Sequence, residues 1–256
     1  MDKQREYILQ RLSKTHFDTL WKFYREYFSD DPSCLQFIFD AVKNEPSNDG
    51  GAYNEMAETP GCYINANGVV IKENVFYPRR MLNAVERFVS VARDMEQIRA
   101  GKDVFKIVFI ISCVENLQNL GNSSLASKSK VQTLLDFFGN YTSDSDKQYI
   151  RTHFRHDDDD PFDPEEDSFK QFIGVLNEYR NCAAHEGDYW DYCFNNNSDG
   201  SSVLLVLHID LNNFSKNQKK EHCFITDISY VDFEAIFVRT CISFIKKYIS
   251  SSQDEA

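Results

Sequence analysis

The sequence lacks the cysteine spacing that zinc sites and disulfide frameworks require. Its seven cysteines are odd in number and widely scattered, and no two of them form a CxxC pair. Closely paired or regularly spaced cysteines are the usual sign of a structural metal site or a disulfide scaffold. We therefore expect free thiols in a cytoplasmic protein, with no bound metal and no cofactor.

Long apolar runs are also missing. The first six residues are mostly charged, and no apolar signal-peptide core follows them. The most apolar stretch, residues 104–114, is interrupted by Lys106 and is too short to cross a bilayer. It predicts a buried helix, and we expect neither secretion nor a membrane span.

The sequence also has no excess of positive charge, since its net charge is -12. Such a surface disfavours non-specific adhesion to nucleic acid or to anionic membranes, so an RNA would need a local basic patch. The chain has 256 residues, of which 42% are hydrophobic. This is enough apolar material for a real core, so we expect a globular protein.

Apolar residues at three- and four-residue spacing dominate the pattern, which predicts a mostly α protein. The segments expected to be helical are 8–28, 35–42, 82–100, 103–120, 128–139, 143–154, 168–186 and 229–249. Short β-prone segments separated by turn residues predict a hairpin and a small antiparallel sheet. The hairpin strands are expected at 62–65 and 69–72, and the sheet strands at 189–194, 202–209 and 222–228.

This pattern divides the chain into two parts. Residues 1–77 form an N-terminal helical extension with a short hairpin. Residues 78–250 form a helical bundle with a β insertion at about 189–228. The last helix is expected to start at a Ser229 cap and to fray from Ser250.

The helix from Ser168 to about Glu186 ends in Arg180, Asn181 and His185, a trio that a core helix does not need. The spacing of Arg and His alone is weak, because it also occurs from Arg11 to His16 and from Arg151 to His156. The first of these pairs is typical of a solvated helix face. The second borders an acidic loop, with metal binding by His153 and His156 as the less favoured alternative.

The context of Arg180 and His185 is different. They end a strongly amphipathic helix, and small residues, Ala183 and Ala184, allow close approach by another surface. On a straight helix, five residues turn the chain by about 140°, so the two side chains would point apart. Either the helix end is distorted or a second subunit completes the site.

At these residues the sequence resembles the HEPN superfamily, whose nuclease members carry Arg, four to six residues and then His. The segment Arg180-Asn181-Cys182-Ala183-Ala184-His185 matches the four-residue spacing and the polar residue after Arg. The resemblance extends over about 78–248, and the apolar helix ending in Val114-Glu115-Asn116-Leu117 and the segment 123–138 are also similar to bacterial members of the family. It implies a HEPN-like helical bundle.

The resemblance also implies a metal-independent endoribonuclease of the toxin, phage-defence or stress-response kind, in which the active site lies at the interface of a homodimer. Its regulator could be an antitoxin. In such an enzyme His185 would act as acid and base, Arg180 would stabilise charge on the phosphate, and Asn181 would orient the groups.

Two further interpretations stay open at this point. The chain could be a non-catalytic HEPN module that binds nucleotide, RNA or a partner protein, or the motif could be a structural helix end in which Arg180 pairs with an acidic neighbour. Glu115 is either such a partner, for Arg180 or His185, or a solvated helix end, which we favour. The candidates for a basic rim around the site are Lys102, Lys106, Lys128 and Lys130.

Overall fold

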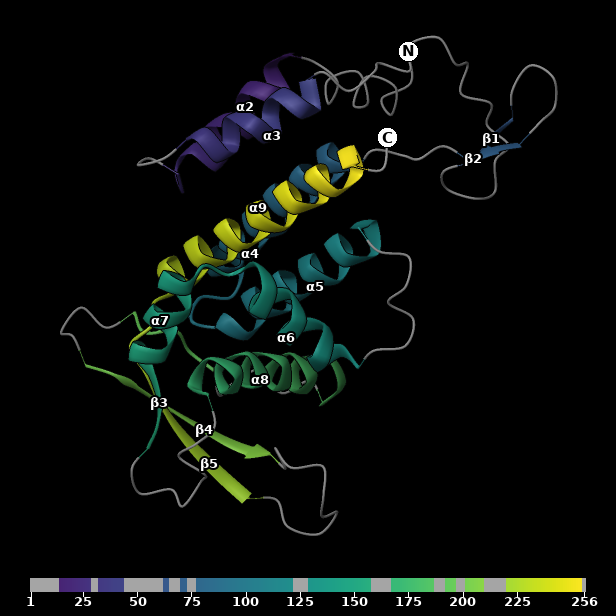
Figure 1. Cartoon of the computed structure of the whole chain (residues 1–256). Coiled ribbons are helices and arrows are strands. Elements are labelled where there is room, and N and C mark those ends of the chain that lie inside the picture. The colour runs from purple at the N-terminus through teal and green to yellow at the C-terminus, as the bar shows by residue number, and fades with distance from the viewer. Residues whose placement is uncertain are drawn as a thin grey trace.

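The computed structural model describes residues 14–28, 32–43, 62–64, 70–72, 77–121, 129–157, 167–186, 192–196, 201–209 and 220–254. Helices dominate these residues, as predicted, and a small antiparallel sheet accompanies them (Figure 1). The helices are α2 (Lys14–Arg25), α3 (Ser33–Lys43), α4 (Pro78–Ile98), α5 (Asp103–Gly121), α6 (Lys130–Tyr141), α7 (Asp144–His153), α8 (Ser168–Asn181), the π-helix η2 (Cys182–Glu186) and α9 (Tyr230–Asp254). The strands are β1 (Cys62–Ile64), β2 (Val70–Lys72), β3 (Phe154–His156), β4 (Val203–Ile209) and β5 (Lys220–Thr226).

Helix α5 lies at the centre of the bundle, as its sequence predicts. It packs against α4, α6, α8 and α9, and apolar residues on several sides of it are buried. By length and composition alone α5 could cross a membrane, and it is the one helix of the described residues that could. Half of that apolar stretch is buried within the same chain, as in the core helix of a helical bundle.

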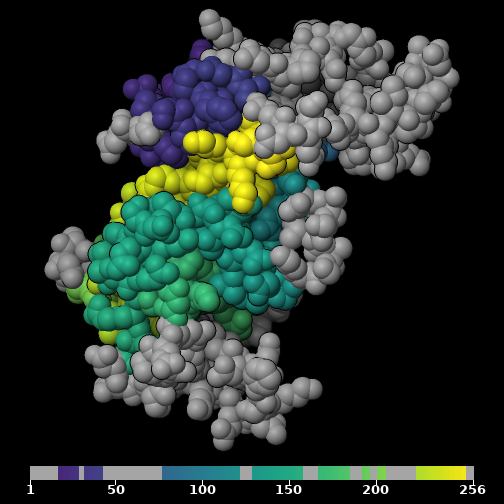
Figure 2. All heavy atoms as spheres, viewed as in Figure 1, coloured from purple at the N-terminus to yellow at the C-terminus, as the bar shows by residue number. Residues whose placement is uncertain are grey.

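Helices α2 and α3 pack on α4 and α9, and their apolar residues belong to the same hydrophobic core as those of the bundle. Figure 2 shows the two helices seated against α9. The buried Tyr24 hydroxyl donates a 2.6 Å hydrogen bond to the carbonyl of Leu82 in α4. The N-terminal extension, where the structure describes it, is therefore fixed to the bundle by both apolar and polar contacts.

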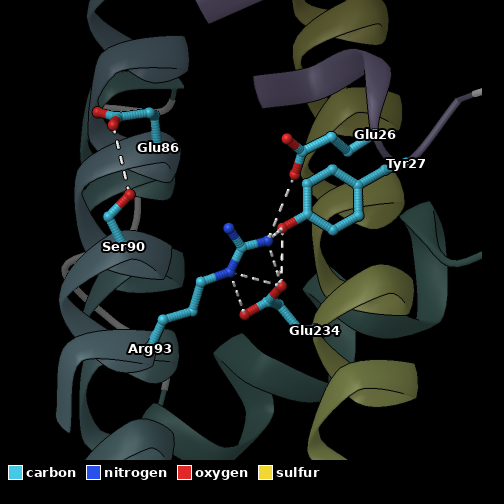
Figure 3. Close-up of polar contacts among 6 residues, drawn as sticks. All are labelled: Glu26, Tyr27, Glu86, Ser90, Arg93 and Glu234. Atoms are coloured by element: carbon cyan, nitrogen blue, oxygen red, sulfur yellow. Dashed lines mark hydrogen bonds and ion pairs between the residues drawn. The ribbon is translucent and has the colours of Figure 1, made fainter. Parts of the chain in front are cut away.

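A polar cluster reinforces this attachment (Figure 3). The carboxylate of Glu234 on α9 is buried and accepts hydrogen bonds from Arg93 on α4, including one of 2.7 Å from Nη2. The Tyr27 hydroxyl, just after α2, donates to the same carboxylate at 2.7 Å and also accepts a hydrogen bond from Arg93. One buried carboxylate thus joins three separate segments of the chain.

The sheet has the order β3-β5-β4, with both pairings antiparallel. The predicted strands at 202–209 and 222–228 correspond to β4 and β5, but the third strand was predicted wrongly. Residues 192–196 are not a strand. Residues 154–156, which begin where the helix 143–154 was expected to end, form β3 instead. The N–H of Phe194 donates at 2.8 Å to buried Asp103 at the start of α5, so this segment packs against the bundle rather than pairing with a strand.

The remaining elements follow the prediction closely. The short hairpin forms between β1 and β2, and its turn lies outside the described residues. Ser229 caps α9, since its hydroxyl accepts from the Asp232 N–H at 3.1 Å and donates to the Asp232 carboxylate at 2.6 Å. Helix α9 continues past Ser250, where fraying was expected, to Asp254.

Candidate functional site

Helix α8 carries the start of the motif. Asp167 caps its first turn by accepting a hydrogen bond from the Phe169 N–H at 3.1 Å. The apolar stripe predicted for this helix is buried, and it holds α8 against α5, α6 and α7. The capped start and the buried stripe together fix the position of the final turn, which contains Arg180 and Asn181.

The motif continues into a π-helix, η2, which contains His185. A π-helix closes its hydrogen bonds over five residues instead of four, and such turns are frequent at functional sites. It rotates the chain less per residue than an α-helix does, so residues five positions apart come closer to one face. The helix end is therefore distorted, which was one of the two solutions expected for the Arg180–His185 spacing.

Arg180 is held by two side chains. Its Nη2 donates a 2.8 Å hydrogen bond to Glu115 Oε1 on α5, and its Nη1 donates at 3.3 Å to Asn181 Oδ1. The Arg180 side chain is only 10% exposed, whereas that of Glu115 is 33% exposed. The expectation that Glu115 is a solvated helix end is wrong, because the carboxylate is the ion-pair partner of Arg180.

Asn181 has a second contact on the same helix. Its Nδ2 donates at 3.4 Å to Glu178 Oε2, one turn earlier. Asn181 therefore bridges Arg180 and Glu178, which limits how both polar side chains can turn. Glu178 was not among the predicted site residues, although its spacing of three residues from Asn181 places the two on one helix face.

The small residues after Asn181 have different environments. Ala183 packs against the hydrophobic core, and Ala184 is exposed. The η2 segment itself packs against α5. The backbone of His185 is described as part of η2, whereas its side chain lies outside the described residues.

The Arg151–His156 segment is accounted for by other contacts. Arg151 makes two hydrogen bonds of 2.9 Å to the Asp167 carboxylate, and His153 Nδ1 bonds to the Tyr149 carbonyl at 2.8 Å. His156 lies in β3 with its ring against Phe224. No cluster of three potential metal ligands occurs among the described residues, and Arg11 lies outside them.

Only part of the expected basic rim is available to a ligand. Lys106 is buried, with 2.6 Å ion pairs to Asp103 and Glu96, so its inclusion in a solvent-facing rim is wrong. Lys128 lies outside the described residues. Lys130, the first residue of α6, is 61% exposed and its Nζ lies 4.0 Å from Glu115 Oε1.

The neighbouring turns of α5 and α8 carry two buried amide oxygens, Gln118 Oε1 and Asn177 Oδ1, which accept no hydrogen bond from the residues that the structure describes. Gln118 follows Glu115 by three residues on α5, and Asn177 precedes Arg180 by three residues on α8. Buried acceptors of this kind are commonly satisfied by ordered water. The interior beside the Arg180–Glu115 pair is therefore polar as well as apolar.

The site contains the shielded cation of Arg180, the exposed cation of Lys130 and, on the adjacent π-helix, His185. A guanidinium has five N–H groups, so Arg180 can bind further acceptors while it is bonded to Glu115 and Asn181. This combination suits an anionic ligand such as a phosphodiester. Comparison of the chain with protein-family models, with curated proteins and with solved structures finds no match.

Proposed function

We propose that this chain is a HEPN-type endoribonuclease that cleaves RNA without a metal ion. In the proposed reaction the ribose 2′-oxygen attacks the adjacent phosphorus, and the bond to the 5′-oxygen of the next nucleotide breaks. Neutral His185 accepts the 2′-hydroxyl proton, and protonated His185 returns a proton to the departing 5′-oxygen. The products carry a 2′,3′-cyclic phosphate and a 5′-hydroxyl.

The observation that supports this proposal best is the fixed position of Arg180, two residues before the π-helix that carries His185. Negative charge builds on the phosphate oxygens during attack, and a preorganised guanidinium stabilises that charge without first having to reorient. The hydrogen bonds to Glu115 and Asn181 supply this preorganisation. Asn181 thus contributes indirectly, because it helps to hold the Arg180 guanidinium in position.

The proposed enzyme works as a cytoplasmic homodimer in which the exposed surface at Ala184 faces the same segment of a second copy. A two-fold axis at this surface brings two copies of the motif together. Sedimentation of the purified protein tests this part of the proposal. RNA cleavage by a strictly monomeric protein contradicts the shared site.

The central experiment is an RNA cleavage assay in EDTA with the His185→Ala variant alongside the native protein. We expect the native protein to cut and to leave 2′,3′-cyclic phosphate ends, and the variant to be inactive. Cleavage that needs an added divalent metal, or an active His185→Ala variant, overturns the proposal.

The chain offers matched controls for residue type. Arg151→Ala and His153→Ala change an arginine and a histidine that are bound elsewhere, on α7. Both variants are expected to retain cleavage, measured at a temperature where their circular dichroism is native. Equal losses in the controls and in the motif variants would mean that destabilisation, rather than chemistry, explains the effect.

A second candidate function is a non-catalytic HEPN module that binds RNA, a nucleotide or a partner protein. The burial of Arg180 and its pairing with Glu115 favour it, because a held arginine also suits a permanent ligand contact. This function predicts RNA binding without cleavage. Unchanged ligand affinity in Arg180→Ala argues against it.

A further inference from the structure

The Glu115 carboxylate lies between two cations that come from different helices. Its Oε1 accepts from Arg180 Nη2 at 2.8 Å, and Lys130 Nζ lies 4.0 Å from the same oxygen. The two nitrogens are therefore no farther apart than the sum of those distances, 6.8 Å. Two cations of one chain thus converge at the end of α8 where the motif lies.

Hydrogen bonds fix the position of Lys130 on the scaffold. Gln118 Nε2 on α5 donates at 3.1 Å to the Thr133 carbonyl in the first turn of α6. Ser129 caps the same turn by accepting from the Gln132 N–H at 3.3 Å. The start of α6 is therefore tied to the helix that carries Glu115, and the Lys130 backbone cannot move away from the site independently.

The two ion pairs differ in strength. The Arg180 pair is short and largely shielded from water, whereas Lys130 is 61% exposed and 4.0 Å from the carboxylate. An exposed lysine pair at that distance contributes little and is easily exchanged, while a shielded hydrogen-bonded pair persists. Glu115 can therefore keep Arg180 in place while Lys130 turns toward another anion.

We propose that Lys130 binds a phosphodiester group of single-stranded RNA, beside Arg180 and in exchange for its loose contact with Glu115. This inference rests on the proposed function in taking RNA as the ligand. Two charge-assisted hydrogen bonds of about 2.7–2.9 Å, together with the width of one phosphate group, cover the separation of the two cations. Lys130 is a substrate-binding residue, and the proton transfers remain with His185.

The test measures how binding of a 2′-O-methyl RNA oligonucleotide, which cannot be cleaved, depends on salt. Fluorescence anisotropy gives Kd at several NaCl concentrations for the native protein, Lys130→Ala, Lys130→Arg and Lys246→Ala. Each phosphate contact to single-stranded nucleic acid contributes about 0.7 to the slope of log K against log salt. We expect Lys130→Ala to lose about that amount of slope and to bind up to about fivefold more weakly.

Two variants serve as controls. Lys130→Arg retains the charge and is expected to keep the native slope. Lys246→Ala removes an exposed lysine from the C-terminal part of α9, which lies far from α8 in Figure 1, and is expected to change nothing. An unchanged slope in Lys130→Ala, or an equal loss in Lys246→Ala, overturns the inference.

Cleavage kinetics separate this inference from the proposed function. If the native protein cuts RNA and Lys130→Ala has native KM, the assignment of Lys130 is wrong and the nuclease stands. If the native protein binds but never cuts, while the slope still depends on Lys130, the nuclease proposal fails and the phosphate contact stands. Absence of RNA binding by the native protein overturns both.

Discussion

Arg180 and Glu115 form a 2.8 Å ion pair that joins the last turn of α8 to α5. The residues are 65 positions apart in the sequence. A mostly buried guanidinium requires such a partner, because an unpaired charge away from water is costly. The pair therefore both explains the burial of Arg180 and sets where the motif lies on the bundle.

Replacing Glu115 by alanine is expected to destabilise the protein by about 1–3 kcal/mol, because it leaves the Arg180 guanidinium poorly solvated and without its carboxylate. Glu115→Gln keeps an acceptor oxygen at the same place and is expected to cost less. Chemical denaturation of both variants at neutral pH gives the two free energies.

Glu26→Ala is the matched control, since Glu26 is 56% exposed and lies 4.0 Å from Arg93. Such a surface pair is expected to change stability by less than about 0.5 kcal/mol. If Glu115→Ala costs no more than Glu26→Ala, the Arg180–Glu115 pair does not stabilise the fold.

The helices could be predicted well because their buried residues recur at local, regular spacing. Local signals also mark helix ends, since the capping pattern of Ser229 and Asp232 predicted the start of α9. Strand β3 could not be predicted in this way. It has three residues, it follows α7 directly, and it pairs with β5, about 70 positions later in the sequence.

The same limit applies to the candidate site. Arg180, Asn181 and His185 were identified from one short segment, whereas the partner of Arg180 was not chosen correctly. Glu115 ends a stretch of apolar helix, and nothing in its local pattern distinguishes a paired carboxylate from a solvated one. Only the packing of α5 against α8 makes that distinction.

Gly121, the last residue of α5, is required by its neighbour on α9. A Cβ atom at this position would lie 2.7 Å from Cζ of Phe244, whose buried ring also packs against Phe137 and Tyr141. The ring has little room to move, so Gly121→Ala is expected to destabilise the fold by about 1–3 kcal/mol.

Gly174→Ala should have the opposite effect. Gly174 lies inside α8, and a Cβ there would meet nothing within 4 Å. Alanine is favoured over glycine in a helix interior by about 0.5–1 kcal/mol. Thermal denaturation compares the two variants, and a stabilising Gly121→Ala would show that Phe244 adapts.

Asp167 makes the stability of α8 dependent on pH. Its two hydrogen bonds from Arg151 lower the pKa of the carboxyl below its usual value. The contribution is therefore complete above about pH 4, the usual Asp pKa, and is lost as the pH falls through the lower folded-state pKa. Asp167→Asn is expected to cost less than about 1 kcal/mol at pH 7, because both side chains are about one-third exposed.

Asparagine retains the ability to cap α8, so this substitution isolates the charge from the cap. The difference in unfolding free energy between the native protein and Asp167→Asn should shrink as the pH falls below the usual Asp pKa of about 4, and vanish only below the lowered folded-state pKa. Urea denaturation at several pH values measures it. A difference that is the same at pH 7 and pH 3 would assign the effect to hydrogen-bond geometry rather than to charge.

Arg180→Lys separates a structural arginine from a catalytic one. Lysine can still place a positive charge near Glu115, so the variant is expected to fold and to lose no more than about 1–2 kcal/mol of stability. It cannot reproduce the planar set of N–H groups that a guanidinium offers to a phosphate, so cleavage is expected to fall about 10²–10³-fold.

Because Glu115 is one-third exposed, even Arg180→Ala should fold, with water and Lys130 near the carboxylate. If Arg180→Ala fails to fold while Arg180→Lys cuts RNA at the native rate, the residue serves as the structural end of α8, and catalysis requires no guanidinium at this position.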